Sequence, residues 1–370
     1  MTPAPTVALP TAPRLPAGPT KPGRAGYVTR LAATAALVGL YYLLRDKLGG
    51  SAVVELTGDA SGARVVAVTA LLVALLAVWW RVVWPDPKLH APMLITAVLA
   101  LADASAGVLE TQHAPPWLTE LTGGVLVEYS PTFLTIGVTL LTELLVGRFF
   151  WGKWPNLTSA YITGISAGIL IKSPVLWPFL LCGMISITAK YVLRVYGRHL
   201  WNPTNFGVTM MLFLAPQHVA SLTVQAGNNG MAVAVIWVLG GMIMYKLGRW
   251  HIPLAFVASF VPLAFLRSGV TGHPWQTEIA PITSPMFQLY IFFMITDPPT
   301  TTRRKWSQVF VAVLVAAAET FYRLAFKDVH SLYHALFTVG PISNLVEVVA
   351  DRVRAARQRE KCEPEIAKGD

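Results

Sequence analysis

Cysteine and charge are both scarce in this 370-residue chain. Its two cysteines, Cys182 and Cys362, are too few for a disulfide scaffold or a four-cysteine metal site. Charged residues make up 13% of the chain, whereas a soluble domain carries about 25%. The sequence also has no phosphate-binding loop, no dinucleotide-binding glycine motif and no HExxH motif. We therefore predict no metal site and no soluble enzyme of these motif-bearing classes.

Apolar segments are abundant instead and run along nearly the whole chain. Hydrophobic residues make up 54% of it, and the mean hydropathy is +0.54. A chain this apolar needs lipid around most of its surface. We predict an all-α, polytopic membrane protein in a lipid bilayer. Its candidate crossings are 29–44, 65–84, 91–109, 132–146, 157–171, 175–193, 205–216, 231–245, 252–266, 282–296, 309–322 and 332–348.

Two of these segments leave the number of crossings open. Segments 205–216 and 282–296 are short and have polar ends, and about 20 residues are needed to span a bilayer. They are interpreted either as crossings or as half-helices that enter the membrane and turn back. The sequence therefore predicts 10–12 transmembrane helices, with re-entrant or broken helices among them.

The positive charges indicate how the chain is oriented. In the twelve-crossing arrangement, 21 of the 29 Lys and Arg residues fall on one side and 7 on the other, with Lys190 inside a segment. The side rich in Lys and Arg is the cytoplasmic one in multi-pass proteins of the cell membrane. Both termini are then cytoplasmic. The net charge of +10 is explained by this bias and by attraction to anionic lipid, so we expect no nucleic-acid partner.

Three regions follow from composition. Residues 1–26 are rich in Pro, Ala and Thr and are expected to form a disordered cytoplasmic tail. Residues 27–350 form the expected membrane domain. Residues 351–370 form a charged cytoplasmic tail that begins as a helix or as a loop.

Ionisable residues within apolar segments are costly, so each is a functional hypothesis. Each also has a structural alternative. Glu143 can pair with Arg148 across a helix end, Lys190 can extend to the cytoplasmic interface, and Glu319 can pair with Arg323 one turn later. The residues in question are Asp103, Glu143, Lys190, Asp297 and Glu319.

A small-residue motif and two polar clusters complete the pattern. The spacing of Gly164 and Gly168 predicts a close contact between two helices. The first cluster, at 197–207, contains Asn202-Pro203 and opens an apolar stretch, whereas the second, at 296–302, contains Asp297 and closes one. Broken helices at membrane depth line cavities or are buried by protein. The clusters therefore indicate either a binding site or helix caps at an interface.

These stretches resemble a known family. The run at 159–164 reads S-A-Y-I-T-G, Lys190 precedes the G-R-H-L-W-N-P-T-N-F-G run at 197–207, and 292–298 reads F-F-M-I-T-D-P. The pattern over about 157–350 is similar to the membrane subunits NqrB, of the sodium-translocating NADH:quinone reductase, and RnfD, of the Rnf complex. The Thr-rich stretch after 298 resembles an UnbU-type branch associated with enediyne antibiotic biosynthesis.

The resemblance implies a helical fold with two inverted repeats and electron transfer through a flavin, FMN or riboflavin. It implies redox or biosynthetic partner proteins. It also implies that the two breaks border a central cavity. The expected lining residues are Lys190, Asn202, Pro203, Asn205, Asp297, Pro298 and Thr300.

The chain departs from the family at the site of covalent flavin attachment. Family members carry FMN on the Thr of an S-G-A-T motif, and the near match here is the S-G-V-T at 268–271, which would place FMN on Thr271. It precedes Asp297 by only 26 residues, much less than in the family. Three functions stay open: a redox membrane subunit, a flavin-free transporter of an ion or small hydrophobic product, and a membrane scaffold for biosynthetic enzymes.

Overall fold

A computed structural model describes residues 112–366 with breaks at 115, 125–127, 153, 156 and 222–229, together with isolated positions at 74, 92, 95, 96 and 99. Apart from those isolated positions, the predicted N-terminal tail, the first three apolar segments and Asp103 lie outside the described residues. The first described helix long enough to cross a membrane therefore belongs to the fourth predicted segment.

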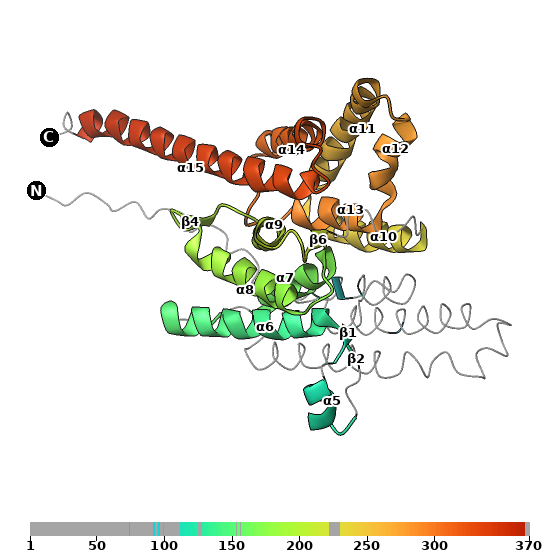
Figure 1. The fold of residues 1–370 in the computed structure, drawn as a ribbon. Coiled ribbons are helices and arrows are strands. Elements are labelled where there is room, and N and C mark those ends of the chain that lie inside the picture. Colours follow the sequence, from blue (N-terminus) through green and yellow to red (C-terminus); the bar gives the residue numbers. More distant parts are fainter. Residues whose placement is uncertain are drawn as a thin grey trace, which may run out of the picture.

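The described part of the chain is helical, with three short antiparallel strand pairs, β1–β2, β3–β6 and β4–β5 (Figure 1). Its elements are, in order, β1 (Gln112–His113), α5 (Pro116–Leu121), β2 (Glu128–Tyr129), α6 (Pro131–Leu145), η1 (Val146–Phe150), α7 (Leu157–Leu170), β3 (Ile171–Lys172), α8 (Trp177–Val192), β4 (Arg194–Val195), β5 (Arg198–His199), α9 (Pro203–Leu214), β6 (Ala220–Ser221), α10 (Gly230–Leu247), α11 (His251–Thr271), α12 (Trp275–Ile279), η2 (Ala280–Thr283), α13 (Pro285–Leu289), η3 (Tyr290–Met294), α14 (Lys305–Phe326) and α15 (Ser331–Ile366).

Two groups of helices lie on either side of α9 in Figure 1. Helices α6, α7 and α8 pack on one another, and α8 also packs on α9. In the second group, α11 packs on α14, α14 on α15, and α10 on α13. Helix α15 also contacts α9, so it joins the two groups.

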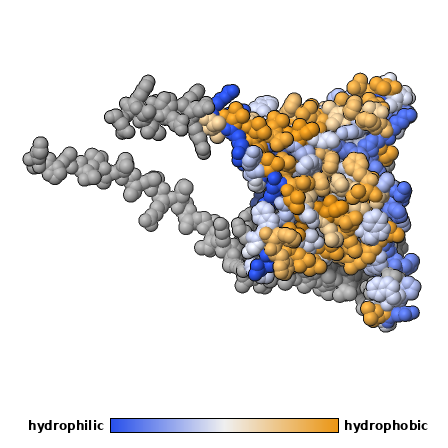
Figure 2. Space-filling view, turned by 60° about the vertical axis from the view of Figure 1, so that its left-hand side comes forward, coloured by the Kyte–Doolittle hydropathy of each residue, from blue (hydrophilic) through white to orange (hydrophobic). Residues whose placement is uncertain are grey.

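The prediction of an all-α polytopic membrane protein is confirmed. Within the described residues, four helices are long and apolar enough to cross a membrane: 131–150, His251–Thr271, Lys305–Phe326 and 331–357. Large apolar side chains such as Phe149, Trp306 and Phe310 are exposed on these helices or at their ends. Apolar residues cover much of the face drawn in Figure 2. Lipid is the medium that such a surface requires.

The two short segments of the sequence form short helices. Helix α9 has 12 residues, and α13 with η3 spans 285–294. At 1.5 Å per residue these helices are about 18 Å and 15 Å long, well short of a hydrocarbon core of about 30 Å. Their lengths favour the half-helix interpretation over full crossings. The start of α9 and the end of η3 then fall inside the protein.

The predicted close contact at Gly164 and Gly168 is confirmed. Both glycines of α7 face α6, and a Cβ atom built on Gly168 would lie 2.7 Å from the Cα atom of Thr132. The Thr132 hydroxyl donates a hydrogen bond of 3.1 Å to the Gly168 carbonyl. Only a residue without a side chain allows the two backbones to approach this closely.

Substituting Gly168 by alanine should destabilise the protein, because the new methyl group would overlap the α6 backbone. We expect Gly168→Ala to lower the unfolding free energy by about 1–3 kcal/mol. Gly137→Ala on α6 is the matched control, since a Cβ atom there meets nothing within 4 Å. Thermal unfolding in detergent measures both. Equal melting temperatures for the two variants would contradict the tight α6–α7 contact.

Candidate functional site

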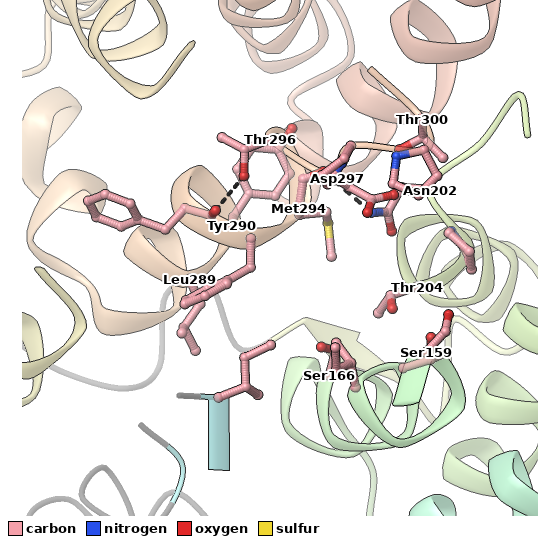
Figure 3. Close-up of a pocket in the computed structure, with 18 of the residues that line it drawn as sticks. Ser159, Ser166, Asn202, Thr204, Leu289, Tyr290, Met294, Thr296, Asp297 and Thr300 are labelled. Carbon is pink, nitrogen blue, oxygen red and sulfur yellow. Dashed lines mark hydrogen bonds between the residues drawn. The ribbon is translucent and has the colours of Figure 1, made fainter. Parts of the chain in front are cut away.

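A cavity of about 350 Å³ lies where helix α9 begins and helix η3 ends (Figure 3). It is walled by α7, α8, α9, α10 and the α13–η3 segment with the loop that follows it. Figure 3 shows Asn202, Asp297 and Thr300 gathered on one side, with Ser159 and Ser166 of α7 opposite them. Most of the remaining lining is apolar and includes Met244, Leu289 and Phe292.

Six of the seven residues singled out from the sequence line this cavity: Lys190, Asn202, Pro203, Asp297, Pro298 and Thr300. The seventh, Asn205, lies outside the lining. It is buried one turn into α9, and its side-chain amide donates to the Tyr333 carbonyl of α15 at 3.3 Å. Asn205 therefore holds α9 against α15 rather than facing the cavity.

Asn202 connects the two helix breaks. Pro203 occupies the first position of α9, and the Asn202 side-chain oxygen caps the helix by accepting from the Asn205 backbone N–H at 3.0 Å. The other end of the same side chain donates to the Met294 carbonyl at the end of η3, at 3.4 Å. Residues 92 positions apart in sequence thus meet through one amide group.

Asp297 lies in the loop just after η3. Its carboxylate accepts a hydrogen bond from the Thr300 hydroxyl at 2.7 Å, and its backbone carbonyl accepts from the Thr300 N–H. Burial raises the pKa of Asp297 to about 6, although Thr300, Arg249 and Asn202 each act to lower it. The carboxyl group can therefore gain or lose a proton near neutral pH.

Hydroxyl groups of α7 form a polar row on the opposite wall. Ser159, Thr163 and Ser166 follow one another at helical spacing and line the cavity, as Thr204 does at the start of α9. The S-A-Y-I-T-G run carries part of the family resemblance, but its hydroxyls are not among the site residues predicted from the sequence. The signal was available, because residues four and three positions apart share one helix face.

Lys190 reaches the cavity from α8 with a buried partner. Its ammonium group contacts both carboxylate oxygens of Glu143 on α6, at 2.5 Å and 2.6 Å, and the Tyr191 hydroxyl donates to the same carboxylate at 2.8 Å. The structural alternatives left open by the sequence paired Glu143 with Arg148 and extended Lys190 to the interface, whereas the structure pairs Glu143 with Lys190. Arg148 lies over the Trp154 ring instead. The packing of α6 against α8 brings Glu143 to Lys190 rather than to a basic residue nearby in the sequence.

His199 is a further lining residue that the sequence analysis did not assign. The β4–β5 hairpin places it, with a two-residue turn in which Tyr196 and Gly197 have positive φ values of 52° and 79°. Its Nε2 atom accepts from Arg194 at 3.1 Å, since arginine can only donate. Burial, with the charges of Arg194 and Lys190, lowers the pKa of His199 to about 4. The ring is neutral near pH 7.

Thr271 does not line the cavity. Its hydroxyl donates to the Arg267 carbonyl at 2.8 Å, at the end of α11, beside a cluster of buried charges. FMN on Thr271 would occupy a separate place from the cavity, and this attachment stays a prediction.

The buried charges near Thr271 centre on Arg267, which lies one residue beyond the predicted segment 252–266. Helix α11 continues past that limit to Thr271, so Arg267 belongs to the helix, and it is 0% exposed. Its guanidinium group contacts Glu278 and Glu319 at 3.0 Å each. The predicted Glu319–Arg323 pair is confirmed at 3.0 Å. Paired carboxylates make the burial of this arginine tolerable.

The lining of the cavity combines apolar and polar groups. Tyr290, Phe292 and Met244 supply apolar surface, whereas Lys190, Asn202 and the hydroxyls can form hydrogen bonds. A flavin ring has this division, and the volume lies in the range of roughly 300–1,000 Å³ typical of ligand pockets. Among the described residues, no group of three or more His, Cys, Asp or Glu side chains could hold a metal ion.

Comparison with known proteins supports the resemblance over part of the chain. Residues 217–336 match the model of the NQR2, RnfD, RnfE family, about a third of the chain. The matched residues include the F-F-M-I-T-D-P run and Thr271, but they begin after the Asn202-Pro203 break. No curated protein matches the chain.

Proposed function

We propose that this chain is a membrane subunit of the NQR2/RnfD/RnfE type that binds a flavin in the cavity between α9 and η3 and passes electrons through it. One observation carries the proposal. The Asn-Pro and Asp-Pro breaks meet at a single cavity and are joined there by the Asn202–Met294 hydrogen bond. The family match over 217–336 supports the assignment of the Asp-Pro half.

The flavin supplies the electron transfer when it is bound, and the protein supplies binding, orientation and proton control. Lys190 and Asn202 would hold the polar edge of the ring by donating hydrogen bonds, and the buried side chains of Tyr290 and Phe292 would keep water out of the site. Asp297 holds or releases a proton beside it, because its pKa lies near 6. The hydroxyls of Ser159 and Thr163 adjust to either a donor or an acceptor.

We also propose an orientation in the membrane, a partner and a biosynthetic setting for this subunit. We place the two breaks on the cytoplasmic side of the cell membrane, because the loops next to them carry Arg194 and Arg198 and the run 303–305, and Lys and Arg are enriched on that side. A redox or biosynthetic enzyme is the proposed partner. The Thr-rich stretch that follows Asp297 supports an enediyne pathway as the setting. Its residues fold back on the site, since Thr300 and Thr301 both donate to Asp297.

Absorption and fluorescence spectra of detergent-purified protein, before and after acid precipitation, test the proposal. We expect flavin that is released into the supernatant, as non-covalent binding in the cavity requires. Flavin retained in the precipitate would move the site to Thr271. Protein that is colourless as purified and does not bind added riboflavin or FMN would overturn electron transfer, and would favour a transporter or a scaffold.

Asp297→Asn is expected to weaken riboflavin binding at pH 7.5 by about tenfold or more. The hydrogen bond that the charged Asp297 carboxylate would accept from the ligand is replaced by a weaker bond to a neutral amide. In the wild type, affinity should rise as the pH increases through about 6, where Asp297 ionises, and the variant should lose this dependence. Fluorescence titration of riboflavin-depleted protein at several pH values measures both effects.

The expression of Asp297→Asn should stay normal. A carboxyl group whose pKa is raised on folding lowers stability as the pH rises from its ordinary value of 3.8 to about 6, so the neutral amide removes a cost at pH 7. Asp328→Asn is the matched control. Asp328 also lies in a loop, but it bonds His334 and the His330 N–H away from the cavity. Equal riboflavin affinity in Asp297→Asn and wild type would exclude Asp297 from the site.

A further inference from the structure

Helix α15 bonds directly to both loops that border the cavity, although none of its described side chains lines the cavity. Asn344 is the first contact. Its side-chain amide, buried at 1% exposure, donates to the Leu200 carbonyl at 2.9 Å and to the Thr300 carbonyl at 2.6 Å. Leu200 precedes Asn202 by two residues, and Thr300 is the residue that bonds the Asp297 carboxylate. One amide group therefore connects the loop before α9 (residues 196–202, the Asn-Pro loop) to the loop after η3 (residues 295–304, the Asp-Pro loop).

Glu347 repeats the connection one turn later on the same helix. Its carboxylate forms an ion pair with Arg198 of the Asn-Pro loop and accepts from the Arg303 backbone N–H at the end of the Asp-Pro loop, at 2.8 Å. Both side chains of the ion pair are 11% exposed. Arg198 also donates to the Thr301 carbonyl at 2.7 Å. The two loops are thus joined at a second level, by charge as well as by hydrogen bonds.

A proline in α15 adds a third bond. Pro341 has no backbone N–H, so the carbonyl of Phe337, four residues earlier, has no partner within the helix. The indole N–H of Trp201, next to Asn202, donates to that carbonyl at 2.9 Å. The Asn-Pro loop therefore bonds α15 at a backbone carbonyl whose usual helical donor is missing.

We propose that Asn344 and Glu347 are positioning residues that hold the two loops at the separation at which the cavity binds its ligand. The inference rests on the proposed function, because it assigns these residues to the same site. Asn344 and Glu347 act through the loop backbone, which sets where Asn202 and Asp297 lie. Without them the loops separate into a range of spacings, only part of which can bind, and the apparent affinity falls by that fraction.

Riboflavin titration of depleted protein is the first test. Asn344→Leu keeps the size of the side chain and removes both donated bonds, and we expect the dissociation constant to rise about tenfold. Glu347→Gln keeps an acceptor for the Arg303 N–H but removes the charge opposite Arg198, so a smaller rise is expected. Thr338→Val is the matched control on α15, since within the described part of the chain its hydroxyl bonds only carbonyls of its own helix, those of His334 and Ala335.

A distance measurement separates this inference from the flavin proposal. Spin labels at Tyr196→Cys and Arg304→Cys, in a Cys362→Ser background, report the spacing of the two loops, and both positions are exposed. We expect the distance distribution to broaden in Asn344→Leu and to stay unchanged in Thr338→Val. Glu347→Gln repeats the test if Asn344→Leu does not fold.

The outcomes differ for the two proposals. Wild-type protein that binds no riboflavin overturns the flavin site, while a broadened distribution in Asn344→Leu still supports the role of α15 in spacing the loops. An unchanged distribution in both Asn344→Leu and Glu347→Gln overturns that role. A broadened distribution with unchanged riboflavin affinity overturns the link between loop spacing and binding.

Discussion

Arg267→Met is expected to lower the stability of the protein more than any other single change considered. Arg267 is fully buried, contacts Glu278 and Glu319, donates to the Thr320 hydroxyl and lies over the Phe260 ring at 4.6 Å. Methionine would leave two carboxylates in the interior, and the basic groups still near them among the described residues are the partly exposed Arg323 and the exposed His273. Breaking a buried ion pair from one side costs about 3–5 kcal/mol. We expect a large loss of monodisperse protein and a much lower melting temperature.

Arg323→Met is the control for this prediction. Arg323 contacts the same Glu319 at 3.0 Å, but its side chain is 30% exposed. A partly exposed pair contributes less because water screens it, and about 1 kcal/mol is expected. Size-exclusion chromatography after heating compares the variants in the same detergent. If Arg267→Met unfolded at the same temperature as Arg323→Met, the cluster would not stabilise the α11–α14 packing.

Lys190→Met is the second large expected effect. It would leave the Glu143 carboxylate, 1% exposed, with the Tyr191 hydroxyl as its remaining hydrogen-bond donor among the described residues. A loss of about 3 kcal/mol is expected from the unpaired charge. The double variant Glu143→Gln/Lys190→Met should recover most of that loss, because it removes both charges together. Thermal unfolding of the two single variants and the double variant gives the coupling energy.

The pattern of this cycle distinguishes two roles of Lys190. Recovery of stability in the double variant, with riboflavin affinity still reduced, would show that Lys190 contributes to the cavity as well as to packing. If the double variant lost as much stability as the two single variants lose together, the buried pair between α6 and α8 would be contradicted.

The helix breaks were within reach of the sequence because their causes are local. Pro203 has no backbone N–H, so a helix begins at this residue but does not continue through it. The Asn202 side chain caps that helix by accepting from the N–H three residues later. The close approach of α6 and α7 was also predictable, since Gly164 and Gly168 lie on one face. The hydroxyls of Ser159 and Ser166 follow the same spacing and could have been added to the predicted site.

The partners of the buried charges were not predictable in the same way. The partner that the sequence offered for Glu143 was Arg148, because the two lie near each other along the chain, yet its partner Lys190 is 47 residues away on α8. The predicted segment 252–266 ends one residue before Arg267, although helix α11 continues to Thr271. Glu278 and Glu319, which make its burial tolerable, come from α12 and α14.

The sequence by itself determined that this protein is helical and lies in a membrane, because a chain this apolar must satisfy its backbone hydrogen bonds within helices in lipid. It also determined where two helices are interrupted, because proline lacks the backbone N–H that a helix needs. Only the tertiary structure decided which groups meet. Asn344 and Glu347 of α15 carry no local signal, and their contacts with Thr300 and Arg198 span 44 and 149 residues. Such contacts depend on how helices pack in three dimensions, which the spacing of residues along one chain does not encode.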